Sequence, residues 1–216
     1  RRVIGSFQTS SDDVQSLSLS GLFKVHRSAH HRTHITLGLQ QSLAATDATD
    51  EVLTPMGMIM QMRLPYGMQI GDQALRLNAA VTHVYIKDDL AIGGQAGGKF
   101  KVDAKDWHFG NSQQLTVWAQ HSINSHLALS SRLTYVRVFG LKGMDALITA
   151  PVQTAIPANY GHRQWRVGLG ANVIMPLFFG AAERLGIELE IPFETDARGV
   201  QMTPKWQLTL GIQKSF

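Results

Sequence analysis

Residues 206–216 read WQLTLGIQKSF, and their apolar and polar side chains alternate. Trp206, Leu208 and Leu210 share one parity, whereas Gln207 and Thr209 share the other. A repeat of two residues is typical of a β-strand with one apolar and one polar face. The C-terminal segment is therefore predicted to be an amphipathic strand.

The same alternation recurs along most of the chain, and helical spacing is not evident over any long stretch. The sequence thus predicts an all-β protein whose consecutive strands pair antiparallel. We expect nine strands and a weaker tenth at residues 2–9. The nine cover residues 14–27, 32–44, 73–86, 89–103, 112–122, 127–142, 160–175, 184–194 and 204–216.

These strands are about 11–16 residues long, whereas soluble strands average roughly five or six residues and tilted membrane strands need about 9–11. Their polar faces also carry whole charges at mid-strand. Both features favour an up-and-down transmembrane β-barrel over a soluble β-sandwich, since a barrel turns its apolar face to lipid and its polar face to a lumen. We expect one barrel domain over residues 1–216 with ten strands, or twelve if an N-terminal part is missing. The charges expected in the lumen are Arg76, Arg132, Arg166, Glu188 and Glu190.

The lengths of the connections support this topology. If Phe216 lies at the periplasmic end, long and short connections alternate along the whole chain, as they do in outer-membrane barrels. The expected outer connections are residues 45–72, 104–111, 143–159 and 195–203, and the expected periplasmic ones are 28–31, 87–88, 123–126 and 176–183.

Composition excludes several other classes of protein. The 216 residues include no cysteine, which excludes disulfides and thiolate metal sites. A hydrophobic content of 44% is too high for a disordered chain. The longest apolar run, residues 173–182, is interrupted by Pro176 and is too short for a helical membrane span. The net charge of +4 is spread along the chain and does not indicate a nucleic-acid partner.

Three segments carry a resemblance to a known family. Residues 54–69 read TPMGMIMQMRLPYGMQ, residues 30–39 read HHRTHITLGL, and residues 184–188 read RLGIE ahead of the C-terminal strand. Together they resemble the outer-membrane transporters of the MetA-pathway-of-phenol-degradation family. Gly67 and Val200 depart from the family pattern, which often has proline at both positions.

The resemblance implies a location in the outer membrane of a Gram-negative bacterium, in contact with outer-membrane lipid and lipopolysaccharide. It also implies transport of small, hydrophobic or aromatic molecules. Family members carry further N-terminal strands. A structural barrel that anchors a partner protein of the envelope is the alternative.

The outer connection at residues 45–72 is rich in methionine. One interpretation is a loop that folds inward as a plug, gate or first binding surface, since methionine adapts to irregular gaps. The other is a copper or silver site built from Met56, Met58, Met60 and Met62, because thioethers are soft ligands and a spacing of two places them on one side of an extended segment. The residues assigned to the gate are Met56, Met58, Met60, Met62, Tyr66 and Met68.

Four histidines, His26, His30, His31 and His34, surround one expected turn. A metal site would need carboxylate partners, and no acidic residue lies between Asp13 and Asp47. A solvated polar turn is the simpler interpretation.

The five lumen charges allow two interpretations. Unpaired charges in a narrow lumen are costly, so we expect cross-strand pairing between the arginines and Glu188 or Glu190. The same groups could instead form a polar constriction that selects permeants.

Motifs of catalysis are missing from the sequence. We find no G-x-S-x-G elbow, no H-E-x-x-H and no P-loop. The pairs Asp12-Asp13 and Asp88-Asp89 lie at expected strand ends, where aspartates favour turns. We therefore expect a protein that is not an enzyme and binds no cofactor.

Overall fold

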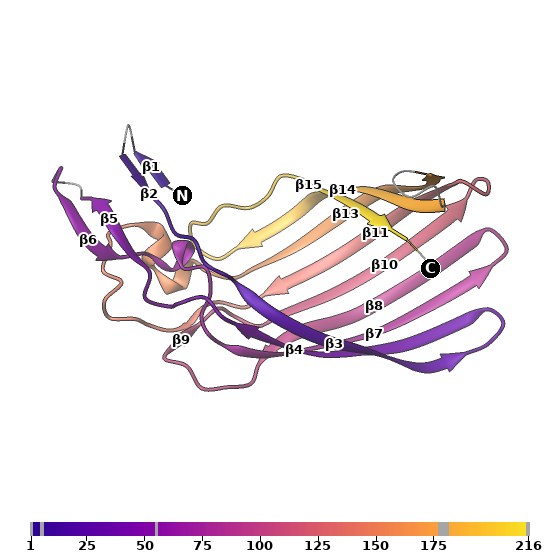
Figure 1. Ribbon diagram of the computed structural model, residues 1–216, viewed down its shortest axis with the longest axis horizontal. Coiled ribbons are helices and arrows are strands. Elements are labelled where there is room, and N and C mark those ends of the chain that lie inside the picture. The colour runs from indigo at the N-terminus through magenta and orange to yellow at the C-terminus, as the bar shows by residue number, and fades with distance from the viewer. Residues whose placement is uncertain (1, 5–6, 55, 177–181, 215–216) are drawn as a thin grey trace.

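The computed structural model describes residues 2–4, 7–54, 56–176 and 182–214, and they form an antiparallel all-β protein (Figure 1). The helical segments among them are single 3₁₀ turns: η1 (Tyr66–Met68), η2 (Gln153–Ala155) and η3 (Pro157–Asn159). None of the helices in this part of the chain has the length and apolar character needed to span a membrane.

One sheet of nine strands dominates the structure. Each strand pairs antiparallel with the next long strand in the chain, so the sheet is an up-and-down meander. The nine predicted strands are thereby confirmed, with boundary shifts of a few residues. They are β3 (Ser16–Arg27), β4 (His31–Ser42), β7 (Leu75–Lys87), β8 (Leu90–Lys101), β10 (Ser112–Ser122), β11 (Leu127–Val138), β13 (His162–Pro176), β14 (Ala182–Ala197) and β15 (Gln207–Gln213).

The predicted alternation of short and long connections is confirmed as well. Tight turns at residues 28–30, 88–89 and 123–126 gather at one end of the sheet, called the turn end. The fourth expected periplasmic connection, residues 176–183, falls mostly on residues 177–181, which lie outside the described residues. The connections 43–74, 102–111, 139–161 and 198–206 gather at the opposite end, the loop end (Figure 1).

The long connections of the loop end form two small two-stranded sheets. β5 (Thr49–Leu53) pairs with β6 (Ile59–Arg63), and β9 (Trp107–His108) pairs with β12 (Lys142–Gly143). The second pairing joins two loops that are separate in the sequence. The long connections are therefore structured and contact one another.

The prediction of a weaker tenth strand at residues 2–9 is wrong. This segment forms β1 (Arg2–Ile4) and β2 (Phe7–Thr9), which pair only with each other. Gly5 and Ser6, residue types that favour turns, separate the two in the sequence. The Thr9 hydroxyl donates to the Glu51 carbonyl at 3.0 Å, which holds β2 beside β5 and away from the main sheet.

The main sheet is open, with β3 and β15 as its two edges. Closure into a barrel is therefore not observed and stays a prediction. In a meander, the ninth strand runs in the same direction as the first. A direct pairing of β3 with β15 would be parallel, whereas antiparallel closure would need an odd number of further strands.

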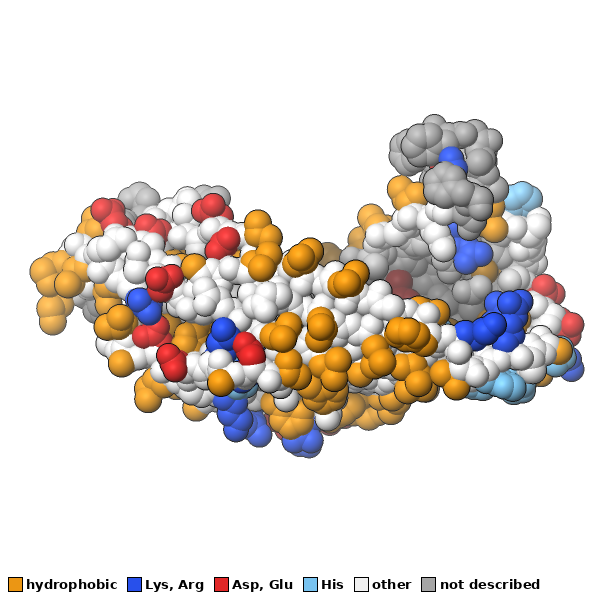
Figure 2. Space-filling view, turned by 60° about the horizontal axis from the view of Figure 1, so that its bottom comes forward, with side chains coloured by type: hydrophobic (Ala, Val, Ile, Leu, Met, Phe, Trp, Pro, Cys, Tyr) orange, Lys and Arg blue, Asp and Glu red, His pale blue; other side chains and the backbone are white. Residues whose placement is uncertain are grey.

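The exposure of side chains on the two faces of this sheet is the reverse of that in a soluble protein. On the apolar face, which carries Leu19, Leu169 and Leu210, these side chains are 82%, 67% and 65% exposed. On the polar face, which carries Thr116 and Thr134, those two side chains are 2% and 1% exposed. The sheet thus curls toward its polar face and crowds the side chains there. Figure 2 shows the apolar side chains as a band across the middle of the molecule, with charged side chains mainly toward its ends.

Candidate functional site

The ion pairs of the polar face link three adjacent strands. The Arg132 Nε of β11 lies 3.1 Å from a Glu188 oxygen of β14, and the Arg166 Nη1 of β13 lies 3.3 Å from a Glu190 oxygen. The Thr134 hydroxyl also donates to Glu190, at 3.3 Å. The predicted cross-strand pairing of these four charges is thereby confirmed.

A glycine on β13 explains how Arg132 reaches two strands away. Gly168 stands in register with both Arg132 and Glu190, so no side chain of β13 separates β11 from β14 at this level. Pairing neutralises each arginine with one carboxylate. The described ladder therefore adds no net charge to the polar face.

A hollow of about 280 Å³ lies on the polar face beside this ladder. Its floor contains Gly186 and Gly211 at positions that point toward the polar side, and a Cβ atom at Gly211 would meet nothing within 4 Å. Its rim carries one aromatic ring together with polar and charged side chains from five strands: Trp118, Gln120, Ser130, Arg132, Asn172, Glu188 and Thr209. We call this feature the glycine hollow.

Trp118 packs over a glycine on the neighbouring strand. Trp118 and Gly93 are register partners on β10 and β8. A Cβ atom at Gly93 would lie 2.3 Å from Cζ2 of the indole, so the ring rests directly over the glycine backbone. Sequence analysis missed both residues, because the register that brings them together is a tertiary feature.

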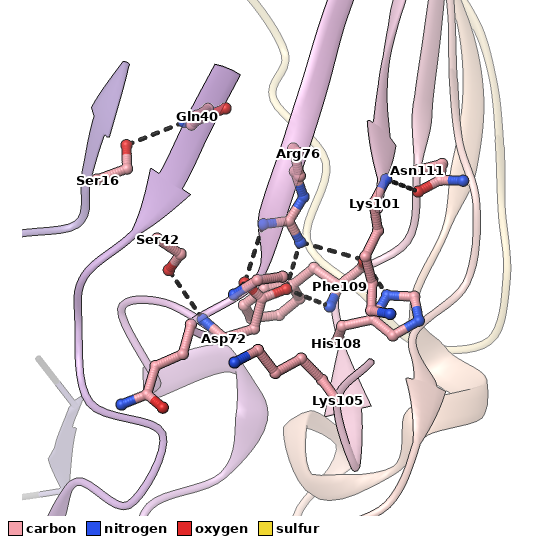
Figure 3. A network of polar contacts seen from close by, with 12 residues as sticks. Ser16, Gln40, Ser42, Asp72, Arg76, Lys101, Lys105, His108, Phe109 and Asn111 are labelled. Carbon is pink, nitrogen blue, oxygen red and sulfur yellow. Dashed lines mark hydrogen bonds and ion pairs between the residues drawn. The ribbon is translucent and has the colours of Figure 1, made fainter. Parts of the chain in front are cut away.

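The fifth predicted lumen charge, Arg76, lies where β7 meets the loop end and is bonded to Asp72 (Figure 3). The Arg76 Nη1 donates to Asp72 Oδ1 at 2.9 Å, and Nη2 donates to Oδ2. The Asp72 carboxylate also accepts from the backbone N–H groups of Phe109, at 2.8 Å, and Ala74, at 3.2 Å. Burial raises the pKa of Asp72, but Arg76 and the N–H groups outweigh it and hold the pKa below its ordinary value of 3.8.

An aromatic cluster packs the loops together above this ion pair. Tyr66 is 1% exposed and its ring contacts that of Trp107 edge to face, at 4.9 Å between centroids. The Tyr66 hydroxyl accepts from the Asp145 N–H at 2.8 Å, and Arg63 pairs with the Asp145 carboxylate at 2.6 Å. Tyr66, assigned to the gate from sequence, is therefore part of the packed interior of the loops.

The methionine segment divides between the β5–β6 hairpin and the 3₁₀ turn η1 that follows it. Met56, Met58 and Met60 are 85%, 52% and 49% exposed near the tip of the β5–β6 hairpin, which stands beyond the ends of the long strands (Figure 1). Met62 and Met68 are half-buried. Val52 and Leu53 pair with Met60 and Ile59, which holds the methionine strand in the hairpin. The gate and plug interpretations stay predictions.

The spacing of the methionines has the predicted effect within β6. Met60 and Met62 stand opposite Val52 and Asp50, on one side of the hairpin. Within residues 2–4, 7–54, 56–176 and 182–214, no group of three or more His, Asp or Glu side chains could hold a metal ion. Copper or silver binding by the methionines stays a prediction.

The histidines lie at the turn end, far along the strands from the methionines. His26, His30 and His31 are exposed, and His34 is half-buried. The register adds His83 of β7, which sequence reasoning missed: its ring centroid lies 5.4 Å from that of His31. Metal binding here is also a prediction, and the exposed side chains agree with a solvated turn.

Comparison with known proteins adds no further information on identity. No family model matches the chain, and no curated protein matches it. The resemblance of residues 30–39, 54–69 and 184–188 to the phenol-degradation family therefore stays a prediction.

Proposed function

We propose that this chain forms the wall of a transmembrane β-barrel in the outer membrane of a Gram-negative bacterium and lets small molecules pass along its polar face. The observation that carries this proposal is the inverted sheet. Leucines on one face are exposed while threonines on the other are buried. Lipid is the solvent in which such an arrangement is favourable.

The extent of the apolar face argues against a soluble protein. Each exposed Å² of apolar surface costs about 25 cal/mol in water, and soluble monomers rarely leave contiguous patches larger than a few hundred Å². Here the exposed apolar residues run along all nine long strands. In a bilayer the same side chains contact acyl chains without this cost.

The asymmetry of the two ends supports an orientation. Barrels of the outer membrane have short periplasmic turns and longer outer loops. The loop end of this sheet would therefore face outward, toward lipopolysaccharide, and the turn end would face the periplasm.

The polar face supports passage of small solutes. Arg132 and Arg166 are paired, and the glycine hollow provides open space of about 280 Å³ beside them. A preference for hydrophobic or aromatic permeants is implied by the family resemblance alone. The proposed role involves no catalysis, cofactor or nucleic acid.

Reconstitution tests the proposal. The full chain, refolded in an amine-oxide detergent and transferred to phospholipid vesicles, should insert and give discrete conductance steps in planar bilayers. Solute-loaded vesicles should swell when it is present and remain unchanged with heat-unfolded protein. A chain that stays monodisperse in water without detergent contradicts the membrane location, and a chain that inserts without conductance or solute uptake contradicts the passage.

A further inference from the structure

The glycine hollow places an aromatic ring next to hydrogen-bonding side chains. On one side the Trp118 indole lies against the Gly93 backbone, so one ring face is packed on the wall and the ring borders the hollow. Across the hollow stand polar side chains of β11, β13, β14 and β15. The site thus offers a flat apolar platform next to hydrogen-bonding groups.

The polar groups of this site are available to a ligand. The side chains of Gln120, Ser130, Asn172 and Thr209 make no hydrogen bond to any other residue of the described part of the chain. Each is both a donor and an acceptor. The Arg132–Glu188 pair adds a charged donor and a charged acceptor at the same rim.

A ligand without hydroxyl groups would fit this rim poorly. Unpaired polar groups that lose water without gaining a partner cost free energy, so a site built to bond hydroxyls discriminates strongly against analogues that lack them. A ligand without a flat apolar face would leave the indole unused. The complementary molecule has both features.

We infer that the glycine hollow binds a six-membered ring with an apolar face and hydroxyl groups around its rim. The ring stacks on Trp118, and its hydroxyls bond to Asn172, Thr209 and the Arg132–Glu188 pair. A pyranose sugar and a hydroxylated aromatic ring share this chemistry. This inference rests on the proposed passage, for which it supplies the class of solute.

Equilibrium binding in detergent tests the inference without requiring transport. The full chain in an amine-oxide detergent, which carries no sugar headgroup, is titrated by calorimetry with methyl α-D-glucopyranoside, with catechol and with toluene. We expect a hydroxylated ring to bind and toluene to bind at least about ten-fold more weakly. The glucoside and catechol titrations distinguish a saturated from an aromatic ring.

Variants locate the site. Trp118→Ala should weaken binding at least about ten-fold, because stacking on an indole is lost, and Trp118→Phe should restore most of it. Trp165→Ala is the matched control, since Trp165 packs on Tyr135 at 4.9 Å on the apolar face. Folding of each variant is checked by the heat-dependent shift in its electrophoretic mobility.

The outcomes separate the inference from the proposed function. Binding that depends on Trp118 in a chain without solute flux supports the hollow and contradicts the passage. Solute flux in a chain whose ring binding is absent, insensitive to Trp118→Ala, or as strong for toluene as for catechol overturns the inference.

Discussion

The Asp72 carboxylate bonds to the Arg76 guanidinium at both of its oxygens and at the same time accepts the Phe109 N–H, so one buried side chain joins a long strand to two loops. Asp72 is 1% exposed, and its own N–H donates to the Ser42 hydroxyl at 3.1 Å (Figure 3). The loop end is therefore anchored to the sheet by this residue.

Replacing Asp72 with asparagine should loosen the loop end. The change leaves the buried Arg76 charge without a carboxylate partner, which costs about 3 kcal/mol. Urea-induced unfolding and cleavage of residues 43–74 by protease measure the effect. Asp196→Asn is the control, since the Arg163–Asp196 pair is more than half exposed on both sides, and such pairs contribute about 0–1 kcal/mol. Equal effects of the two changes would refute the anchoring role.

The loop end should lose stability in acid, at pH values below the ordinary pKa of a carboxyl group. Arg76 and Arg63 hold the pKa values of Asp72 and Asp145 below 3.8 despite burial of both groups. The folded state therefore binds these protons more weakly than the unfolded state. The stabilisation is complete above pH of about 4 and is lost as pH falls through the lowered pKa values. Protease cleavage of the loops after brief acid exposure measures this, and cleavage that rises between pH 7 and 5 would contradict it.

Tyr160 should ionise at a higher pH than an ordinary tyrosine. Burial and the neighbouring Tyr66 raise the pKa of Tyr160 to about 12, although the Gly67 backbone opposes the shift. The folded state thus holds this proton more tightly, so its contribution to stability is lost as pH rises from 10 through 12. Absorbance at 295 nm should show a late-titrating component among the four tyrosines that disappears in Tyr160→Phe. A late component that persists in this variant would assign it elsewhere.

A lysine on the apolar face should impair membrane insertion. Leu169 lies in β13 and is 67% exposed; in a bilayer, Leu169→Lys should cost about 2–4 kcal/mol, whereas in water it would be neutral. Leu147→Lys is the matched control, since Leu147 is 63% exposed but belongs to the connection between β12 and β13. Folding titrations in lipid vesicles compare the two, and indistinguishable midpoints would argue that the apolar face does not contact lipid.

Removal of one carboxylate from the ladder should change stability and ion selectivity together. Glu190→Gln leaves Arg166 unpaired in a site where the two side chains are 9% and 16% exposed, at a cost of about 3 kcal/mol. The uncompensated positive charge should shift the reversal potential under a salt gradient toward anion selectivity. The double change Arg166→Gln and Glu190→Gln should restore the selectivity, and a reversal potential unchanged in Glu190→Gln would place the ladder outside the conduction path.

Strand positions could be read from the sequence because the two-residue repeat is a local signal. The long strands and the alternation of short and long connections were predicted in this way and are observed. The prediction of a tenth strand was wrong because the alternation in residues 2–9 is too short. It does not determine whether the chain crosses the sheet or reverses. Pairing of Arg132 with a glutamate of β14 could be predicted because both lie on the polar parity of strands that are only two apart in the sheet.

The sequence by itself determined which side of each strand is apolar, since a side chain's parity follows from backbone geometry alone. Only the tertiary structure decided which side chains meet across strands, because that depends on register. Register placed Trp118 over Gly93, Gly168 between Arg132 and Glu190, and His83 beside His31. The packing of the loops made Asp72 an anchor and Tyr66 a buried core residue. Sequence could not show this, since Phe109 and Trp107, the partners of these two residues, are distant in the sequence.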